Sequence, residues 1–128
     1  MPQPSFMLLY VSSPKASAAF YADLFGSQPI EASPNFVLFA LDAGLMLGLW
    51  KRQTVEPAAT ATGTGGELAC AVDDAASVEA LHADWRGRGL TIIQTPTAMD
   101  FGRTFVAVDP DGHRLRVFAP VQVAEPVR

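Results

Sequence analysis

The feature that most constrains this chain is a segment that occurs twice. In the first copy, LLYVSSPKASAAFYADLFG, an apolar run leads to Ser13, which suits the N-cap of a helix, and to Pro14 at the first helical position. Gly26 stands where that helix should end. The second copy, LACAVDDAASVEALHADWRGRG, has an apolar run, a cap at Asp73 or Asp74, a helix and a glycine stop in the same order. Two strand-helix units of one design are therefore predicted.

The match between the copies extends along the helices and into the strands that follow. A shift of 61 residues superposes Val11 on Val72, Phe20 on Leu81, Ala22 on Ala83, Asp23 on Asp84 and Gly26 on Gly87. After the first helix, strands are predicted near Pro29 to Ala32, in NFVLFAL and in LMLGLW; after the second, in LTIIQT, RTFVAV and HRLRVF. Turns are expected at 42–44 and at 109–112. Each half is β-α-β-β-β, which predicts an α+β fold.

Length and composition decide whether the two halves are separate domains. A chain of 128 residues with 49% hydrophobic content can bury one core but not two of ordinary size. We therefore expect a single domain over residues 1–128, with module 1 at about 5–57 and module 2 at about 67–120. Residues 58–66 are small, uncharged and rich in Gly and Thr, which predicts a flexible connector.

Side chains of a strand alternate between two faces, so each predicted strand divides into two sets. One set is apolar and is expected beneath the helices: Met7, Leu9, Val11, Leu45, Leu47, Leu49, Leu68, Cys70, Val72, Val106, Val108, Leu115 and Val117. In the first helix one broad apolar face is expected to cover it, made of Ala16, Phe20 and Leu24 with Ser17, Tyr21 and Phe25 beside them. In the second helix the expected face contains Val78, Leu81 and Trp85. The opposite set mixes aromatic, small and charged residues: Phe6, Leu8, Tyr10, Met46, Gly48, Trp50, Glu67, Ala69, Ala71, Phe105, Ala107, Asp109, Arg114, Arg116 and Phe118. Such a mixture resembles a pocket lining.

Charge and cysteine content exclude several classes of function. The formal net charge is −4 and the pI about 4.9, so nucleic acid and anionic membrane surfaces are poor partners. The start of the chain has neither a signal-peptide pattern nor a membrane-spanning run, and a cytoplasmic protein is expected. Cys70 is the only cysteine; it excludes an intramolecular disulfide and is interpreted as an inert core residue rather than a nucleophile.

The duplicated plan, the pair Phe20-Tyr21 on the first helix and the closing DPDGH hairpin resemble the vicinal-oxygen-chelate superfamily, which includes glyoxalase I, extradiol dioxygenases and bleomycin-resistance proteins. The resemblance covers about residues 6 to 119. It implies an eight-stranded mixed sheet curled into a cup, assembled as a homodimer with the cup as the binding site.

Enzymes of that superfamily hold a divalent metal in the cup, and the resemblance places its four ligand positions at Phe6, Gly48, Glu67 and Arg116. Only Glu67 could coordinate a metal, because Phe and Gly have no side-chain lone pair and a guanidinium stays protonated. His82 and His113 are interpreted as surface or edge residues. We therefore expect neither a metal nor another cofactor. Two roles are open for Arg116 and Glu67. They could form an ion pair that fills the position of the absent metal, or Glu67 could hold an arginine that binds a carboxylate or carbonyl of a planar guest, and the two roles can coexist.

A narrower resemblance concerns the guest. The segments FGRTF, DPDGH, LLYVS and the pair Leu49-Trp50 are similar to phenazine-antibiotic resistance proteins of the superfamily, in which a tryptophan at the end of the fourth strand stacks on the ligand. Trp50 matches that position, although it could also be a rim or dimer-contact residue. The prediction is a non-enzymatic homodimer that sequesters a planar aromatic compound; the alternative is a glyoxalase- or dioxygenase-type lyase or isomerase. The expected ligand-binding residues are Trp50, Phe6, Tyr10, Met46, Glu67, Phe105, Arg114, Arg116 and Phe118.

Overall fold

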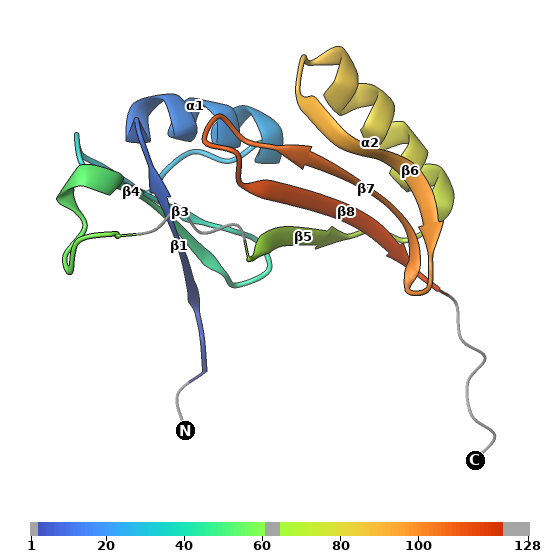
Figure 1. Ribbon diagram of the computed structural model, residues 1–128, viewed down its shortest axis with the longest axis horizontal. Helices are drawn as coiled ribbons and strands as arrows, with labels where there is room; N and C mark the ends of the chain where they lie inside the picture. Colours follow the sequence, from blue (N-terminus) through green and yellow to red (C-terminus); the bar gives the residue numbers. More distant parts are fainter. Residues whose placement is uncertain (1–2, 61–64, 122–128) are drawn as a thin grey trace. The chain divides into compact units, whose positions relative to one another are not determined.

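The computed structural model describes residues 3–60 and 65–121 and divides into two compact units, Met1–Gly63 and Thr64–Arg128. Each unit is a four-stranded sheet with one helix (Figure 1). Of the predicted connector, residues 61–64 lie outside the described residues, and the flanking residues 58–60 and 65–66 form no helix or strand. Among the described residues, no helix has the length and apolar character needed to cross a membrane.

The first unit contains β1 (Phe6–Val11), α1 (Pro14–Phe25), β2 (Glu31–Ala32), β3 (Phe36–Ala40) and β4 (Met46–Lys51), followed by a short 3-10 helix at Arg52–Thr54. Its strands lie in the order β1-β4-β3-β2. The first strand pairs in parallel with β4, and the other pairs are antiparallel, so the sheet is mixed.

The second unit contains β5 (Glu67–Ala71), α2 (Ala75–Gly87), β6 (Thr91–Met99), β7 (Gly102–Val108) and β8 (Arg114–Pro120). Its order, β5-β8-β7-β6, and its one parallel pair repeat those of the first unit. The register repeats too: Leu8 is the partner of Gly48 in one unit, and Ala69 is the partner of Arg116 in the other. The predicted β-α-β-β-β duplication and the α+β class are confirmed.

Local capping explains where the helices begin and end. The Ser13 hydroxyl accepts a hydrogen bond from the Ala16 amide at 3.1 Å, and Gly26 ends α1 in the left-handed region with φ of 64°. In the second unit the Asp74 carboxylate accepts from the Ser77 amide at 2.8 Å. The predicted glycine stop is wrong by two residues, because Gly87 is still helical and the left-handed residue is Gly89, with φ of 86°.

The helix faces agree with the prediction except at Ala16, at the edge of the α1 face. In α1 the buried residues are Pro14, Ser17 and Tyr21, whereas Ala16 is exposed. Burial is thus greatest on the Ser17 and Tyr21 side of the predicted face, and the Tyr21 ring contacts both Phe20 and Phe25. In α2, Val78 and Trp85 are buried and Leu81 is half-buried, as predicted.

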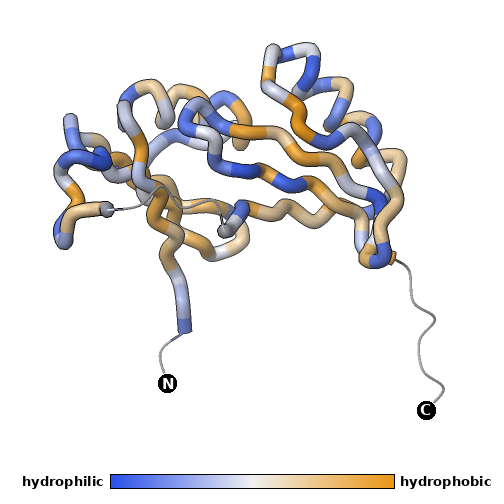
Figure 2. The backbone as a smooth tube through the Cα atoms, in the orientation of Figure 1, coloured by the Kyte–Doolittle hydropathy of each residue, from blue (hydrophilic) through white to orange (hydrophobic). Residues whose placement is uncertain are grey.

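The division of strand faces is confirmed in the first unit and wrong for one strand of the second. Leu9, Val11, Leu47 and Leu49 are buried, and α1 packs on β3 and β4. Along β8, Leu115 and Val117 are buried while Arg114 and Arg116 occupy the other face. The colours of β8 in Figure 2 alternate between hydrophilic and hydrophobic.

The strand whose faces were predicted wrongly is β7. Phe105 is the partner of Val117, and in an antiparallel pair partners share a face, so Phe105 lies on the helix-covered side. Its ring is fully buried and contacts Trp85 of α2 at 5.3 Å between centroids. Val106, expected beneath the helix, is instead the partner of Arg116. Phe105 is therefore absent from the sheet face on which it was predicted to bind a ligand.

Candidate functional site

One face of the first unit's sheet lies opposite α1 and is called here the aromatic face. Its side chains are almost all apolar. Its residues are Phe6, Leu8, Tyr10, Phe36, Leu38, Ala40, Met46, Gly48 and Trp50, with Glu31 of β2 as its one charged member among the described strands. Phe6 is 54% exposed and Leu8 is also exposed, so this unit by itself leaves a large apolar surface uncovered. Four of the predicted ligand-binding residues, Trp50, Phe6, Tyr10 and Met46, lie together here.

Trp50 is at the centre of an aromatic cluster on this face. Its ring centroid is 6.2 Å from that of Tyr10 and 6.4 Å from that of Phe36, with interplanar angles of 85° and 87°. Register explains the contacts, because Tyr10 and Phe36 are the direct partners of Trp50 in the two neighbouring strands. Phe36 was missed in the sequence; its place in a hairpin with LMLGLW was the signal that could have found it.

The backbone at Gly48 is approached closely by two neighbouring side chains. A Cβ atom at this position would lie 2.7 Å from Cδ2 of Leu8 and 2.9 Å from Cζ of Phe36. The space where a longer side chain would stand is therefore filled by apolar atoms. The family's metal-ligand position at Gly48 has neither a donor atom nor room for one without movement of these neighbours.

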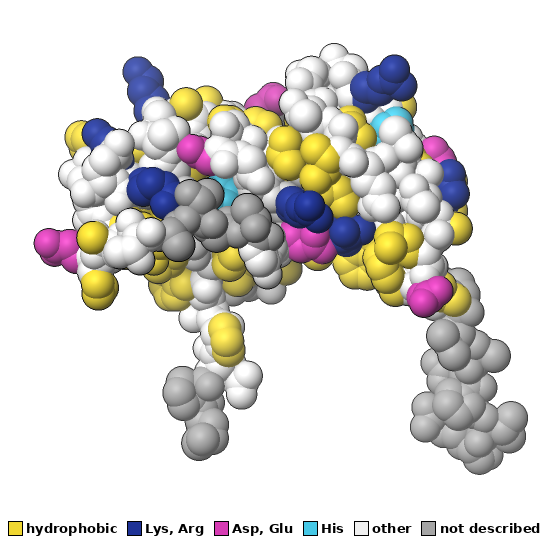
Figure 3. All heavy atoms as spheres, in the orientation of Figure 1, with side chains coloured by type: hydrophobic (Ala, Val, Ile, Leu, Met, Phe, Trp, Pro, Cys, Tyr) yellow, Lys and Arg dark blue, Asp and Glu magenta, His cyan; other side chains and the backbone are white. Residues whose placement is uncertain are grey.

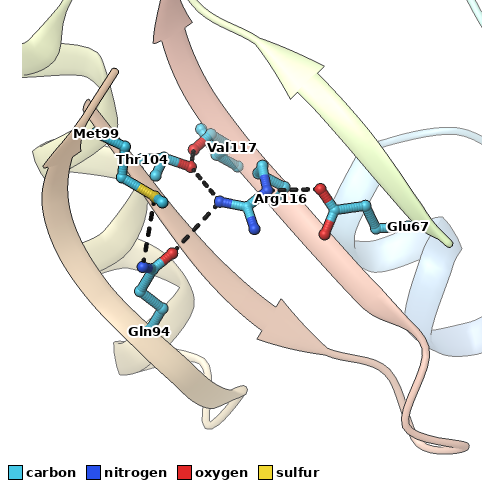
Figure 4. Close-up of polar contacts among 6 residues, drawn as sticks. All are labelled: Glu67, Gln94, Met99, Thr104, Arg116 and Val117. Atoms are coloured by element: carbon cyan, nitrogen blue, oxygen red, sulfur yellow. Dashed lines mark hydrogen bonds and ion pairs between the residues drawn. The ribbon is translucent and has the colours of Figure 1, made fainter. Parts of the chain in front are cut away.

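On the second unit, the sheet face opposite α2, called here the polar face, is organised around Arg116 (Figure 4). Its Nε donates to Oε1 of Glu67 at 2.6 Å, and its Nη1 donates to Oε1 of Gln94 at 3.3 Å and to Oγ1 of Thr104 at 3.1 Å. The Thr104 hydroxyl donates in turn to the carbonyl of Val117 at 2.8 Å. The predicted ion pair between Glu67 and Arg116 is present.

Aromatic rings complete the surroundings of Arg116. Its guanidinium carbon lies 5.7 Å from the centroid of the Phe101 ring, within cation–π range. Phe101 in turn makes an edge contact with Phe118 at 6.0 Å. Neither Phe101 nor Gln94 was among the predicted site residues. Gln94 could not be assigned to this face from strand alternation, because the register of β6 shifts between Ile92 and Gln94 and again between Gln94 and Thr97.

These contacts also test whether the family's metal fits this chain. Phe6 offers no donor, Gly48 is covered, and the carboxylate of Glu67 is engaged by the guanidinium at the fourth position. Within residues 3–60 and 65–121, no three His, Cys, Asp or Glu side chains come together as metal ligands could. The donor set at the four positions does not fit a divalent cation.

A hollow of about 230 Å³ opens on the polar face, lined by Ile93, Gln94, Val106, Arg114 and Arg116. Arg114 is exposed, and no ion pair joins it to a described residue. Figure 3 shows basic side chains beside an acidic one over the part of the sheet formed by β5 and β8. Glu67, Arg114, Arg116 and Phe118, predicted as ligand-binding residues, share this face.

The remaining reactive groups lie away from both faces. Cys70 is half-buried on the helix-covered side of β5, and burial raises the pKa of its thiol. His82 stacks edge-on against Phe105 at 5.4 Å, and its Nε2 has no hydrogen-bond partner in the described part of the chain. The backbone amide of His113 donates to the Asp109 carboxylate, which closes the predicted turn.

Comparison with known proteins agrees with this geometry. The chain belongs to the Glyoxalase/Bleomycin resistance protein/Dioxygenase superfamily, whose family model matches residues 4–117. It is 30% identical over 117 residues to the phenazine antibiotic resistance protein EhpR of Enterobacter agglomerans, with 89% of each chain covered.

Solved structures show the same fold. Protein ATC0852 from Agrobacterium tumefaciens, determined by solution NMR, is 51% identical with a TM-score of 0.87, over 95% of this chain and 100% of that one. Lactoylglutathione lyase from the same organism has a TM-score of 0.75 at 21% identity, over 91% of this chain and 92% of that one. At that identity the likeness concerns the fold alone.

Proposed function

We propose that this protein is a non-enzymatic binding protein that sequesters a small, planar, antibiotic-like aromatic compound in a metal-free cup, as a homodimer. Trp50 is the stacking platform of the aromatic face, and the arginines of the polar face are the groups of the second unit that suit a polar oxygen of a guest. The observation that carries the proposal is the half-buried indole of Trp50, which is held by two rings at nearly right angles and has no parallel neighbour among the described residues. Offset stacking on such a ring contributes about 0.5–1.5 kcal/mol beyond area burial.

The occupants of the family's metal positions support binding rather than metal-dependent conversion. Phenylalanine, glycine and a salt-bridged carboxylate–guanidinium pair supply no open coordination site for a substrate oxygen. The first unit thus presents an apolar face and the second unit a face with fixed polar groups, and both kinds of group are typical of small-molecule sites.

Sequence similarity to EhpR supports a planar aromatic compound as the ligand. EhpR, at 30% identity over nearly the whole chain, is a phenazine antibiotic resistance protein, and phenazines are flat, fused aromatic rings of the kind that an indole can stack on. Phenazine itself is therefore the first probe.

The test is a fluorescence titration with phenazine that uses both tryptophans. Trp50 lies on the aromatic face, whereas Trp85 is buried against Phe105 beneath α2 and serves as an internal reference. Quenching is expected in the wild type and in Trp85→Phe, and is expected to vanish in Trp50→Phe. Equal quenching in the two variants, or no saturable quenching at all, would contradict the proposal. Metal analysis that finds one divalent ion per chain would favour a lyase or isomerase instead, and light scattering checks the dimer.

A further inference from the structure

Arg116 is committed to interactions within the protein. Of the five N–H donors of its guanidinium, three are used by Glu67, Gln94 and Thr104, and its side chain is only 17% exposed. The ring of Phe101 lies against the same group. The Arg116 guanidinium is therefore held in one position, and its charge is paired with the Glu67 carboxylate.

Arg114 is in the opposite situation, although it stands closer to Glu67 along the sheet. The backbone register makes Glu67 the direct partner of Arg114, which is where a cross-strand ion pair would ordinarily form. The carboxylate instead reaches diagonally to Arg116. The carboxylate opposite Arg114 in the register is thus engaged by another residue, and no ion pair joins Arg114 to any described residue.

The charge around the hollow is unbalanced as a result. Two guanidinium groups, Arg114 and Arg116, line it, and among the described residues Glu67 is the one carboxylate paired with them, so the sum of these three charges is +1. Ile93 and Val106 form apolar parts of the wall. An incoming anion would offset the surplus positive charge and accept paired hydrogen bonds from a guanidinium fork.

The duplicated fold shows that this charge is specific to the second unit. The strand equivalent to β8 in the first unit is β4, and the residues equivalent to Arg114 and Arg116 are Met46 and Gly48. The same register position thus carries the apolar Met46 in one unit and, in the other, the cation Arg114, which forms no ion pair with a residue that the structure describes.

We propose that Arg114 is the residue that selects guests bearing a carboxylate or phosphate group, and that Arg116 is a positioning residue whose charge is held by Glu67. This inference rests on the proposed small-molecule binding function and adds a charge requirement to it. The guest class becomes a planar compound with an anionic oxygen group at its edge.

The experiment compares phenazine-1-carboxylate with its neutral counterpart phenazine-1-carboxamide at pH 7.5. The wild type is expected to bind the carboxylate about tenfold more tightly, and Arg114→Gln should bring the ratio of the two Kd values to about one with little change for the carboxamide. Arg86→Gln, which removes an equal charge from an exposed position on α2, is the matched control and should keep the preference. Salt should weaken only the carboxylate complex.

Equal affinity for the two probes in the wild type, or a preference that survives Arg114→Gln and is lost in Arg116→Gln, would overturn the inference while leaving the binding function intact. An independent arm titrates inorganic phosphate and follows the Nε–Hε signal of Arg114 in a nitrogen-15 spectrum. Movement of that signal supports an anion site at Arg114 even if no phenazine binds. In that case the proposed binding of aromatic compounds is wrong, but the anion site stands. A static Arg114 signal counts against the anion site itself.

Discussion

Two ion pairs in the second unit have the same short geometry but different exposure, and together they make a controlled prediction. Arg116 and Glu67 approach to 2.6 Å between Nε and Oε1, with side chains 17% and 30% exposed. Arg103 and Glu79 also approach to 2.6 Å between the same atoms, with side chains 37% and 49% exposed. Any difference in their contributions to stability therefore reflects the surroundings rather than the distance.

The expected magnitudes follow from where each pair lies between solvent and core. Exposed pairs contribute about 0.2–1 kcal/mol in double-mutant cycles, whereas breaking a fully buried pair costs about 3–5 kcal/mol. We expect a coupling energy of about 0.5 kcal/mol for Arg103 with Glu79, close to the exposed limit. For Arg116 with Glu67 we expect about 1.5 kcal/mol, because less solvent screens the pair and its partners fix the guanidinium.

The assay is urea unfolding of the single and double variants Glu67→Gln and Arg116→Met, with Glu79→Gln and Arg103→Met as the reference cycle. A Trp50→Phe background leaves Trp85 as the sole tryptophan, and Trp85 belongs to the same unit as both pairs. Coupling energies that agree within about 0.3 kcal/mol would refute the argument that burial, rather than contact distance, sets the strength of these pairs.

Two further predictions concern backbone and capping. Gly102→Ala would drive a Cβ atom into the carbonyl oxygen of Ala119 at a φ of 139°, so a loss of about 3 kcal/mol or more in unfolding free energy is expected. Gly87→Ala meets open space at the end of α2 and should instead stabilise the protein by about 0.5 kcal/mol. Chemical unfolding of the two variants compares them. Hydrogen bonds from Ser77 lower the pKa of Asp74, so its contribution is present above the unfolded carboxyl's pKa and is lost as pH falls through the lower folded value. The difference in melting temperature between wild type and Asp74→Ala should therefore shrink from pH 6 to pH 3, and a constant difference would contradict this reasoning.

Local signals in the sequence predicted the elements well. The Ser13 cap and the left-handed Gly26 were readable because each depends on residues only a few positions away. The stop of α2 was misplaced because RGRG offers two glycines to end the helix, and alignment with Gly26 favoured the first. The helix continues through Gly87, Arg88 is its C-cap, and the left-handed residue is Gly89.

The candidate site was predicted only where the two faces of a strand differ in polarity. Along β8, arginines alternate with Leu115 and Val117, so residue order alone was enough to assign the polar face. Along β7 both alternating sets are apolar at their centre, with Phe105 in one and Val106 in the other. Strand alternation then gives two equivalent solutions, and the prediction chose the wrong one.

The sequence by itself determined the duplicated order of strands and helices, their caps and turns, and the replacement of the family's metal ligands, because each of these depends on residue identity and on neighbours in the chain. Tertiary structure alone decided that Glu67 joins Arg116 rather than the adjacent Arg114, that Gln94 and Thr104 complete the network, and that Phe105 turns towards α2. The physical reason is that these contacts depend on the register between strands that are distant in sequence. That register changes at the shifts in β6, and packing of the strands against α2 favours one arrangement.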